Sequence, residues 1–287
     1  MNIKEQFKKT EKLYHFTSFV TALKIIGTNR LRFGRLNNMN DIHENDKLMF
    51  VDANGQGIDE FPSEVLDTLY DEIYKYRQIS FTADSEEGDK NGFDLHQMWG
   101  LYANKGEGVC LVFDKDELEK NYDMVTIHKK RVNYDEAQLL ESYVVSLSKE
   151  HEAVSDEIKN KLSKIFFHKR KEWEHEQEYR LIKRCPNTTK EEYLLLGHAL
   201  KYVILSSKLR NIDEMLYFKK IEDIKDHVEN IEKARNIGEL GRIHVLIYGN
   251  GLFDYSLITE DGEEELWNSK DGYDVLVSGE NYELALD

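Results

Sequence analysis

The stretch that decides the fold is Gly-Val-Cys-Leu-Val-Phe at residues 108–113. It consists almost wholly of apolar residues, and no charged side chain interrupts it. A strand whose two faces are both buried has this pattern, whereas a half-exposed strand alternates apolar and polar residues. We therefore expect this run to be a central strand of a sheet.

Apolar and aromatic runs on both sides of this stretch predict the rest of the sheet and its helices. Further strands are expected at residues 13–17, 30–33, 78–82, 179–182, 202–205 and 243–248. Helices are expected at 19–26, with Ser18 or Thr17 as the cap, and at 62–76, where Val65, Leu69 and Ile73 belong to an apolar stripe. Further helices are expected at 96–103, at 137–173 as one long helix or two, and at 211–234. Trp99 and Trp173 are expected to pack in the core. The order of these elements favours the α+β class, with a mixed sheet surrounded by helices. No linker marks a domain boundary. We place the boundary near residue 205, between a main domain of residues 1–205 and an extension of residues 206–287 that packs on it.

The net charge of the chain is strongly negative but unevenly distributed. The 287 residues carry a formal charge of −16, and residues 251–287 contain eleven acids against one base. Residues 164–184 are instead locally basic, with seven Lys or Arg against four Glu. The mean charge opposes long-range attraction to nucleic acid or an anionic membrane, but it does not exclude a local basic surface. The acidic C-terminal region is expected to be a solvated face.

Other sequence features exclude several classes of protein. Two cysteines are too few for a disulfide framework or a four-cysteine zinc site, and we expect both to be reduced thiols. The N-terminus lacks an apolar run of signal-peptide length, and no stretch approaches the roughly 18 apolar residues of a membrane span. We therefore expect a cytoplasmic protein without a membrane partner.

Three short polar motifs fall on or beside the predicted strands. They contain His15 in Tyr-His-Phe-Thr, the Ser80-Phe-Thr82 motif, and Glu176 with Glu178 in Glu-Gln-Glu-Tyr-Arg. Each alone has an ordinary explanation as a core histidine, a strand-end turn or a solvated mixture of charges. Their order along the chain, however, resembles the core of the ADP-ribosyltransferases. In that superfamily a His or Arg on the first strand holds the ribose of NAD, a Ser-x-Ser/Thr strand shapes the pocket, and a late Glu-x-Glu supplies the catalytic carboxylate.

This resemblance implies an enzyme with a split mixed sheet around a cleft and with NAD as its substrate. The activity would be ADP-ribosyl transfer or NAD hydrolysis, with Glu178 as the catalytic group, Glu176 acting on the acceptor and His15 positioning the ribose. The resemblance places these further residues at the NAD site: Thr17, Asn40, Ser80, Thr82 and Arg180. The Asn40-Asp41 pair is, however, more typical of a turn, and Arg180 could pair with a carboxylate instead of a pyrophosphate.

The proposed chemistry explains why a carboxylate is needed. Cleavage of the bond between nicotinamide and ribose passes through an oxocarbenium-like state, as glycoside cleavage does. A fixed carboxylate that faces the growing positive charge stabilises this state. Residues i and i+2 of a strand share a face, so Glu176 and Glu178 are expected to lie side by side on a strand.

Four ordered motifs also resemble an uncharacterised bacterial family that is scattered among prophage and defence loci. They lie at residues 36–44, 79–82, 97–103 and 173–181, the last reading Trp-x-x-Glu-x-Glu-Tyr-Arg-Leu, and the resemblance extends over residues 13–205. In this chain Met-Asn-Asp-Ile-His replaces Phe-Asn-Asp-Pro-Phe, and Thr82 replaces a serine, but neither change removes a group that the chemistry needs. The resemblance implies an intracellular bacterial effector, with phage defence as one setting, and supplies no agreed activity.

Two other functions remain open. Asp41, His43 and Glu44 could join the Glu176–Glu178 pair as ligands of Mg²⁺ or Mn²⁺ in a metal-dependent nuclease, although Arg180 stands where such enzymes carry a lysine. Alternatively, the chain is a non-catalytic sensor or binding module. The sequence does not specify the acceptor, which could be protein or nucleic acid, or the oligomeric state.

Overall fold

The architecture comes from a computed structural model, which describes most of the chain in separate stretches. The longer ones are residues 10–36, 61–86, 90–121, 126–135, 153–161, 165–206, 217–241 and 243–248. Shorter pieces are residues 50–51, 54, 57, 59, 145–146, 252–256, 263–268 and 275–278. By compactness the chain divides into a first unit, Met1–Leu31, Thr82–Tyr122 and Leu195–Asp287, and a second unit, Arg32–Phe81 and Asp123–Leu194. The boundary expected near residue 205 stays a prediction.

The first unit is built on a mostly antiparallel sheet with the expected central strand inside it. In spatial order its strands are β17 (Val275–Ser278), β16 (Glu263–Asn268), β15 (Leu252–Ser256), β14 (His244–Tyr248), β13 (Leu200–Ser206), β6 (Val109–Asp114) and β1 (Lys12–Thr17). Only β13 and β14 pair in parallel among these strands of the described chain. All six residues of β6 are buried between β1 and β13. The prediction of a central strand is therefore confirmed.

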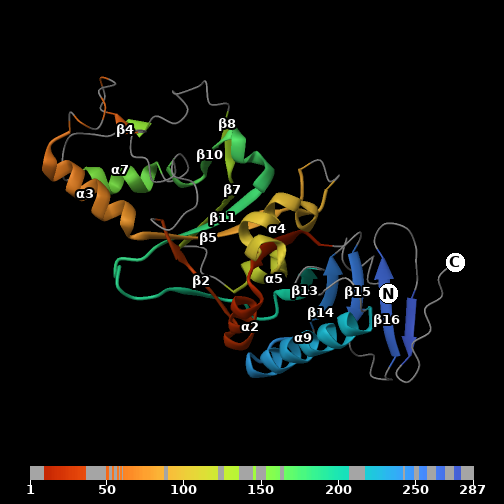
Figure 1. Cartoon of the computed structure of the whole chain (residues 1–287). Helices are drawn as coiled ribbons and strands as arrows, with labels where there is room; N and C mark the ends of the chain where they lie inside the picture. The colour runs from red at the N-terminus through yellow and green to blue at the C-terminus, as the bar shows by residue number, and fades with distance from the viewer. Residues whose placement is uncertain are drawn as a thin grey trace. The chain divides into compact units, whose positions relative to one another are not determined.

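The helices of the first unit begin and end at recognisable signals. Helix α2 (Phe19–Thr28) is capped by Ser18, whose hydroxyl accepts a hydrogen bond from the Thr21 N–H, and it ends at Asn29 in a left-handed conformation. Helix α9 (Tyr217–Ile237) packs against α2, as Figure 1 shows. The short helices are η5 (Gly92–Asp94), α4 (His96–Tyr102), η6 (Asn104–Gly106) and α5 (Lys115–Glu119).

An aromatic cluster forms the core beneath α4. Phe16 of β1 meets Trp99 of α4 edge to face at 5.2 Å between ring centroids, and the Trp99 indole N–H donates to the Phe93 carbonyl. The cluster also contains Tyr14, whose hydroxyl donates to Asp84. Trp99 is thus a core residue, as its helical spacing favoured.

The second unit has a smaller sheet built around β11 (Glu178–Arg184). β11 lies between β7 (Ile127–Arg131), with which it pairs antiparallel, and β5 (Tyr76–Ala83), whose other edge carries β3 (Gly34–Arg35). Residues 82 and 83 of β5 belong to the first unit and pair there with β1. β10 (His168–Arg170) and β8 (Asn133–Asp135) form a separate parallel pair, as do β4 (Phe50–Val51) and β9 (Val145–Ser146). Two further strands, β2 (Arg30–Arg32) and β12 (Tyr193–Leu195), each contain a point at which the chain passes from one unit to the other.

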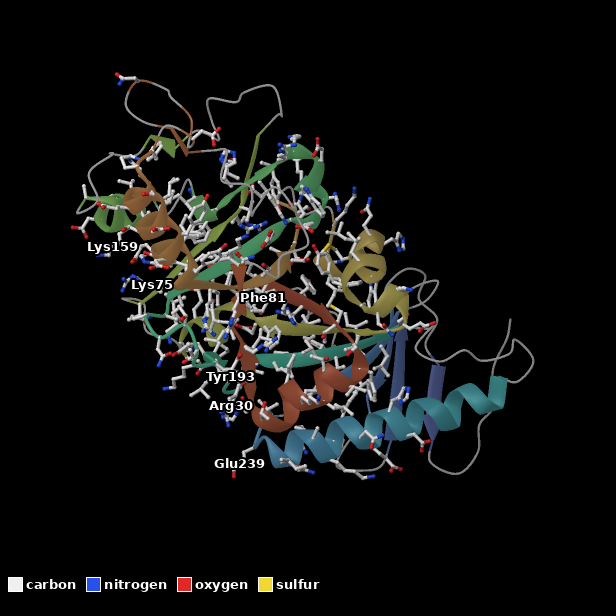
Figure 2. All side chains as sticks on the ribbon, turned by 60° about the vertical axis from the view of Figure 1, so that its left-hand side comes forward. Arg30, Lys75, Phe81, Lys159, Tyr193 and Glu239 are labelled. Carbon is white, nitrogen blue, oxygen red and sulfur yellow. The ribbon has the colours of Figure 1, made fainter. Side chains whose placement is uncertain are left out.

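Two helices close the core of the second unit. Helix α3 (Ser63–Tyr74) buries the predicted stripe of Val65, Leu69 and Ile73, and it lies beside α7 (Val154–Asn160) (Figure 1). The hydrophobic cluster that they enclose also contains Phe166 and Ile182. On the outer surface, charged side chains such as Lys159 point away from this core (Figure 2).

The expectation of a helix through residues 137–173 is wrong in the part that the structure describes. The described residues of this range include α7 and the helical residues 165 and 166. Residues 145–146, however, form β9, residues 168–170 form β10, and Lys171–Glu176 form the 3-10 helix η7. The reason is a non-local pairing: β10 bonds to β8, more than 30 residues earlier, and local periodicity carries no signal for it.

The described chain therefore belongs to the α+β class, with a multi-stranded, mostly antiparallel sheet and several helices. None of the helices that the structure describes has the length and apolar character needed to cross a membrane.

Candidate functional site

The candidate site lies at the start of β11, where the chain leaves η7. Glu176 is the last residue of η7, Gln177 takes a left-handed conformation with φ of 47°, and β11 begins at Glu178. Glu176 and Glu178 are therefore not neighbours on one strand, which corrects the expectation from their spacing. The left-handed residue ends the helical turn, and both carboxylates are instead brought to the same third residue.

That third residue is Lys169, in β10. Its ammonium nitrogen lies 2.6 Å from Glu176 Oε2 and 3.3 Å from Glu178 Oε2. All three side chains are 5% exposed or less. Buried charges are stable only when they are paired, so these contacts explain how two glutamates can be enclosed together.

Arg180 holds Glu178 from a different direction. Residues 178 and 180 share one face of β11, and the Arg180 guanidinium bonds both oxygens of the Glu178 carboxylate at 2.6 and 2.8 Å. A third N–H of Arg180 donates to the Phe166 carbonyl at 2.7 Å. The alternative in which Arg180 pairs with a carboxylate is thus the one that the structure contains. This bidentate contact fixes both the position and the orientation of Glu178.

Ser80 and Tyr134 complete the surroundings of Glu178. The Ser80 side chain hydrogen-bonds the Glu178 carboxylate and also accepts a bond from the Gln78 amide at 3.1 Å. The Tyr134 hydroxyl accepts the backbone N–H of Glu178 at 2.9 Å. With Lys169 and Arg180 included, residues of four strands, β5, β8, β10 and β11, therefore hold Glu178 in place.

These contacts keep Glu178 negatively charged. Burial alone would raise the pKa of the carboxyl, but the charges of Arg180 and Lys169, with hydrogen bonds from Arg180 and Ser80, outweigh burial and lower its pKa to about 2. Burial and the nearby Glu178 charge together raise the pKa of the Tyr134 hydroxyl. At neutral pH the site therefore holds an ionised carboxylate beside a neutral phenol.

Trp173 covers the Lys169 ammonium. The ammonium nitrogen is 4.8 Å from the centre of the indole ring, within the range of a cation–π contact, and the His175 ring stacks beside Trp173 at 6.1 Å. Sequence reasoning assigned Trp173 to packing and did not single out Lys169. The only signal for Lys169 was its place in the basic segment 164–184, because its contact with the glutamates depends on the turn through η7.

The structure thus brings Ser80, Glu176, Glu178 and Arg180 together in the second unit. His15 and Thr17 belong to β1 of the first unit.

The placement of His15 and Thr82 follows from the register of the first unit. Tyr14 pairs with Thr82, so these two share a face of the sheet, and His15 points to the opposite face of β1. Thr82 is buried, and its hydroxyl finds no hydrogen-bond partner within the part of the chain that the structure describes.

Several predicted positions lie outside the described residues. They are Asn40 and the proposed metal ligands Asp41, His43 and Glu44. Among the residues that are described, no three His, Cys, Asp or Glu side chains are grouped so that they could hold a metal ion.

One comparison with known proteins bears on this site. Residues 98–181 match a family described as "Protein of unknown function (DUF2971)". The match begins in α4 and ends within β11, so it includes Lys169, Trp173, Glu176, Glu178 and Arg180. It covers under a third of the chain and supports the expectation of an uncharacterised domain family. The chain has no match among the curated proteins or among the solved structures.

Proposed function

We propose that the chain catalyses NAD-dependent ADP-ribosyl transfer or NAD hydrolysis, with Glu178 as the catalytic carboxylate. The observation that carries this proposal is the position of Ser80 beside the buried Glu178, whose carboxylate Arg180 bonds at both oxygens. It joins the Ser-x-Thr strand to the Glu-x-Glu segment, the two motifs whose order resembles the ADP-ribosyltransferase core. The fold proposed for the main domain is accordingly the split mixed sheet of that superfamily.

The state of Glu178 suits the reaction. When nicotinamide leaves, positive charge develops on the ribose, and a carboxylate stabilises it only while it is ionised and fixed in position. The low pKa of Glu178 supplies the first condition. The bidentate bond from Arg180 supplies the second, so Arg180 acts as a positioning residue for Glu178 in this proposal.

The other residues keep the roles that the resemblance implies. Glu176 orients or deprotonates the acceptor, and Ser80 lines the NAD site beside Glu178. The resemblance also assigns His15, Thr17, Asn40 and Thr82 to NAD. These assignments stay predictions, because His15, Thr17 and Thr82 belong to the first unit and Asn40 lies outside the described residues. Because Glu178 is only 4% exposed in the described structure, the proposal requires a state in which NAD reaches this carboxylate.

A second candidate is a non-catalytic binding or sensor module, and one observation favours it. The oxygens of Glu178 are already bonded to Arg180, Lys169 and Ser80, and the two carboxylates are balanced by two cations. A satisfied buried ion-pair network of this kind can have a purely structural role.

Incubation of the purified chain with NAD labelled in both its nicotinamide and its adenine parts separates the two candidates. We expect release of labelled nicotinamide by the wild type and a loss of about 100-fold or more in Glu178→Gln. Glu174→Gln is the matched control, because Glu174 precedes Glu178 by four residues and its side chain is 46% exposed. Protein, RNA and DNA are offered as acceptors, and transfer of the adenine label to one of them separates transferase from hydrolase.

The proposal fails if the folded wild type neither consumes NAD nor transfers label with any of these acceptors. It also fails if Glu178→Gln retains full activity. The first result would leave the non-catalytic module as the function.

A further inference from the structure

The Lys169 ammonium lies in a small enclosure that has the chemistry of a cation site. Two carboxylates, Glu176 and Glu178, contact the nitrogen at 2.6 and 3.3 Å, and the face of Trp173 lies 4.8 Å from it. Carboxylates and an indole face are the groups that recognise ammonium and other organic cations in proteins. The Lys169 ammonium and both carboxylates are buried and Trp173 is partly buried, so the contacts between the charges are stronger than the same contacts in water.

The two cations at the site are not equivalent. Arg180 lies on the same strand as Glu178, and N–H groups from all three of its nitrogens are bonded within the second unit, to Glu178 and to the Phe166 carbonyl. Lys169 comes from β10, a strand of a different sheet, and contacts each carboxylate through a single ammonium group on a flexible stem. Arg180 therefore belongs to the wall of the site. Movement of Lys169 away from the site would leave Glu178 paired with Arg180, and the buried Glu176 would then require another cation in place of Lys169.

We propose that Trp173, Glu176 and Glu178 form a binding site for an organic cation, and that Lys169 occupies this site as an internal competitor. A cationic ligand binds there only by displacing the Lys169 ammonium. Lys169 thus regulates access to the two carboxylates and holds the site closed when no ligand is present.

The identity of the natural ligand rests on the proposed function. The nicotinamide ring of NAD is a pyridinium cation, and its departure leaves an oxocarbenium-like ribose. Both positive groups would face Glu178, next to which the Lys169 ammonium now lies. Displacement of Lys169 would then be the step that precedes binding of NAD, and a variant without this lysine would bind NAD more tightly than the wild type does.

The probe for the site itself is the 1-methylnicotinamide cation, with neutral nicotinamide as its uncharged counterpart. Binding to the full chain is measured by calorimetry and by quenching of tryptophan fluorescence. We expect Lys169→Met to bind the cation about 10- to 30-fold more tightly than the wild type, as the loss of a desolvated competitor predicts. Neutral nicotinamide is expected to show no such gain.

Two further variants control the result. Lys171→Met removes an exposed lysine two residues away, which pairs with Glu174, and is expected to behave as the wild type. Lys169→Met/Glu176→Gln removes one carboxylate of the enclosure together with the lysine, and it is expected to lose most of the gain in affinity.

A stability measurement covers the case in which Lys169→Met folds poorly. Lys169→Ala leaves space for an alkylammonium ion, so propylammonium chloride is expected to raise the Tm of this variant, or to restore its folding. The same salt should have no such effect on Lys171→Ala, and sodium chloride at equal ionic strength should have none on either variant.

The inference is overturned if Lys169→Met folds but binds 1-methylnicotinamide no better than the wild type, or if propylammonium does not stabilise Lys169→Ala. Its failure is distinguishable from failure of the proposed function. Tight cation binding by Lys169→Met without any NAD consumption would retain the cation site and refute the NAD reaction. NAD consumption that depends on Glu178, with an unchanged KM in Lys169→Met, would retain the reaction and refute the competitor.

Discussion

Glu178→Gln is the substitution whose effect on stability the structure defines most closely. The amide has nearly the same shape as the carboxylate but carries no charge. It leaves Arg180 buried with a neutral partner that offers one acceptor oxygen in place of two. Lys169 keeps its 2.6 Å contact with Glu176, so the variant buries one positive charge that nothing in the cluster balances.

Two separate arguments give similar values for the stability that this substitution removes. The site lowers the pKa of Glu178 from 4.5 to about 2, and at about 1.4 kcal/mol per pH unit this difference favours the charged form by about 3 kcal/mol. Removing one partner of a buried ion pair generally costs about 3–5 kcal/mol. We therefore expect Glu178→Gln to lower the free energy of unfolding by about 3 kcal/mol at pH 7.

The same pKa fixes how this loss depends on pH. Because the pKa of Glu178 is lower in the folded chain than in the unfolded chain, its contribution is fully present above the unfolded value of 4.5. The contribution is lost as the pH falls through the folded value of about 2. The difference in stability between wild type and Glu178→Gln should accordingly shrink as the pH is lowered from about 5 to about 2.

Urea unfolding at pH 7 and at pH 3 measures both quantities, and hydrogen exchange of the β11 amides reports locally. Glu174→Gln is the control, since Glu174 is exposed and its pair with Lys171 should contribute no more than about 0.5 kcal/mol. The reasoning is refuted if Glu178→Gln costs under about 1 kcal/mol at pH 7, or if its cost does not decrease with pH.

Two other predictions concern packing in the first unit and thiol chemistry. Gly108→Ala should destabilise the fold by about 1–3 kcal/mol, because the added methyl group would meet the Thr17 carbonyl and the Ala103 backbone. Gly100→Ala, in α4 with open space around it, should be neutral or stabilising by up to about 1 kcal/mol, and thermal melts compare the two. Burial raises the pKa of both cysteine thiols, so neither Cys110 nor Cys185 should react with a thiol reagent at pH 8 until denaturant is added.

The elements that local pattern determines could be predicted from the sequence. The unbroken apolar run at 108–113 predicted β6, and the spacing of Val65, Leu69 and Ile73 predicted α3 together with its buried face. Of the two residues predicted as caps of α2, Thr17 and Ser18, Ser18 is the one that caps it. These predictions succeed because the burial of a strand or helix determines the order of apolar and polar residues along that element. A strand with two buried faces is apolar throughout, and a helix with one buried face has apolar residues at helical spacing.

The candidate site could be predicted only in part, because its geometry depends on contacts between distant segments. The Glu-x-Glu spacing drew attention to the right glutamates, but it predicted a shared strand face instead of the turn through η7 and the left-handed Gln177. Nothing in the sequence linked Lys169 to Glu176. Their contact requires residues 168–170 to form a strand paired with β8, in a region where a helix was expected. Long-range pairing of this kind has no local signature.

The composition of the cluster is itself an argument that it does more than stabilise the fold. Two carboxylates and two cations are each 5% exposed or less, and an ion-pair network of this kind often contributes no more stability than apolar residues of the same volume would. Arg180 alone pairs with both oxygens of Glu178, so that part of the network is complete without Lys169. The second pair, Lys169 with Glu176, adds the cost of burying two more charges and puts an ammonium group against an indole face. We therefore expect the second pair to serve the proposed cation site, in which a ligand replaces the Lys169 ammonium beside Glu176 and Trp173.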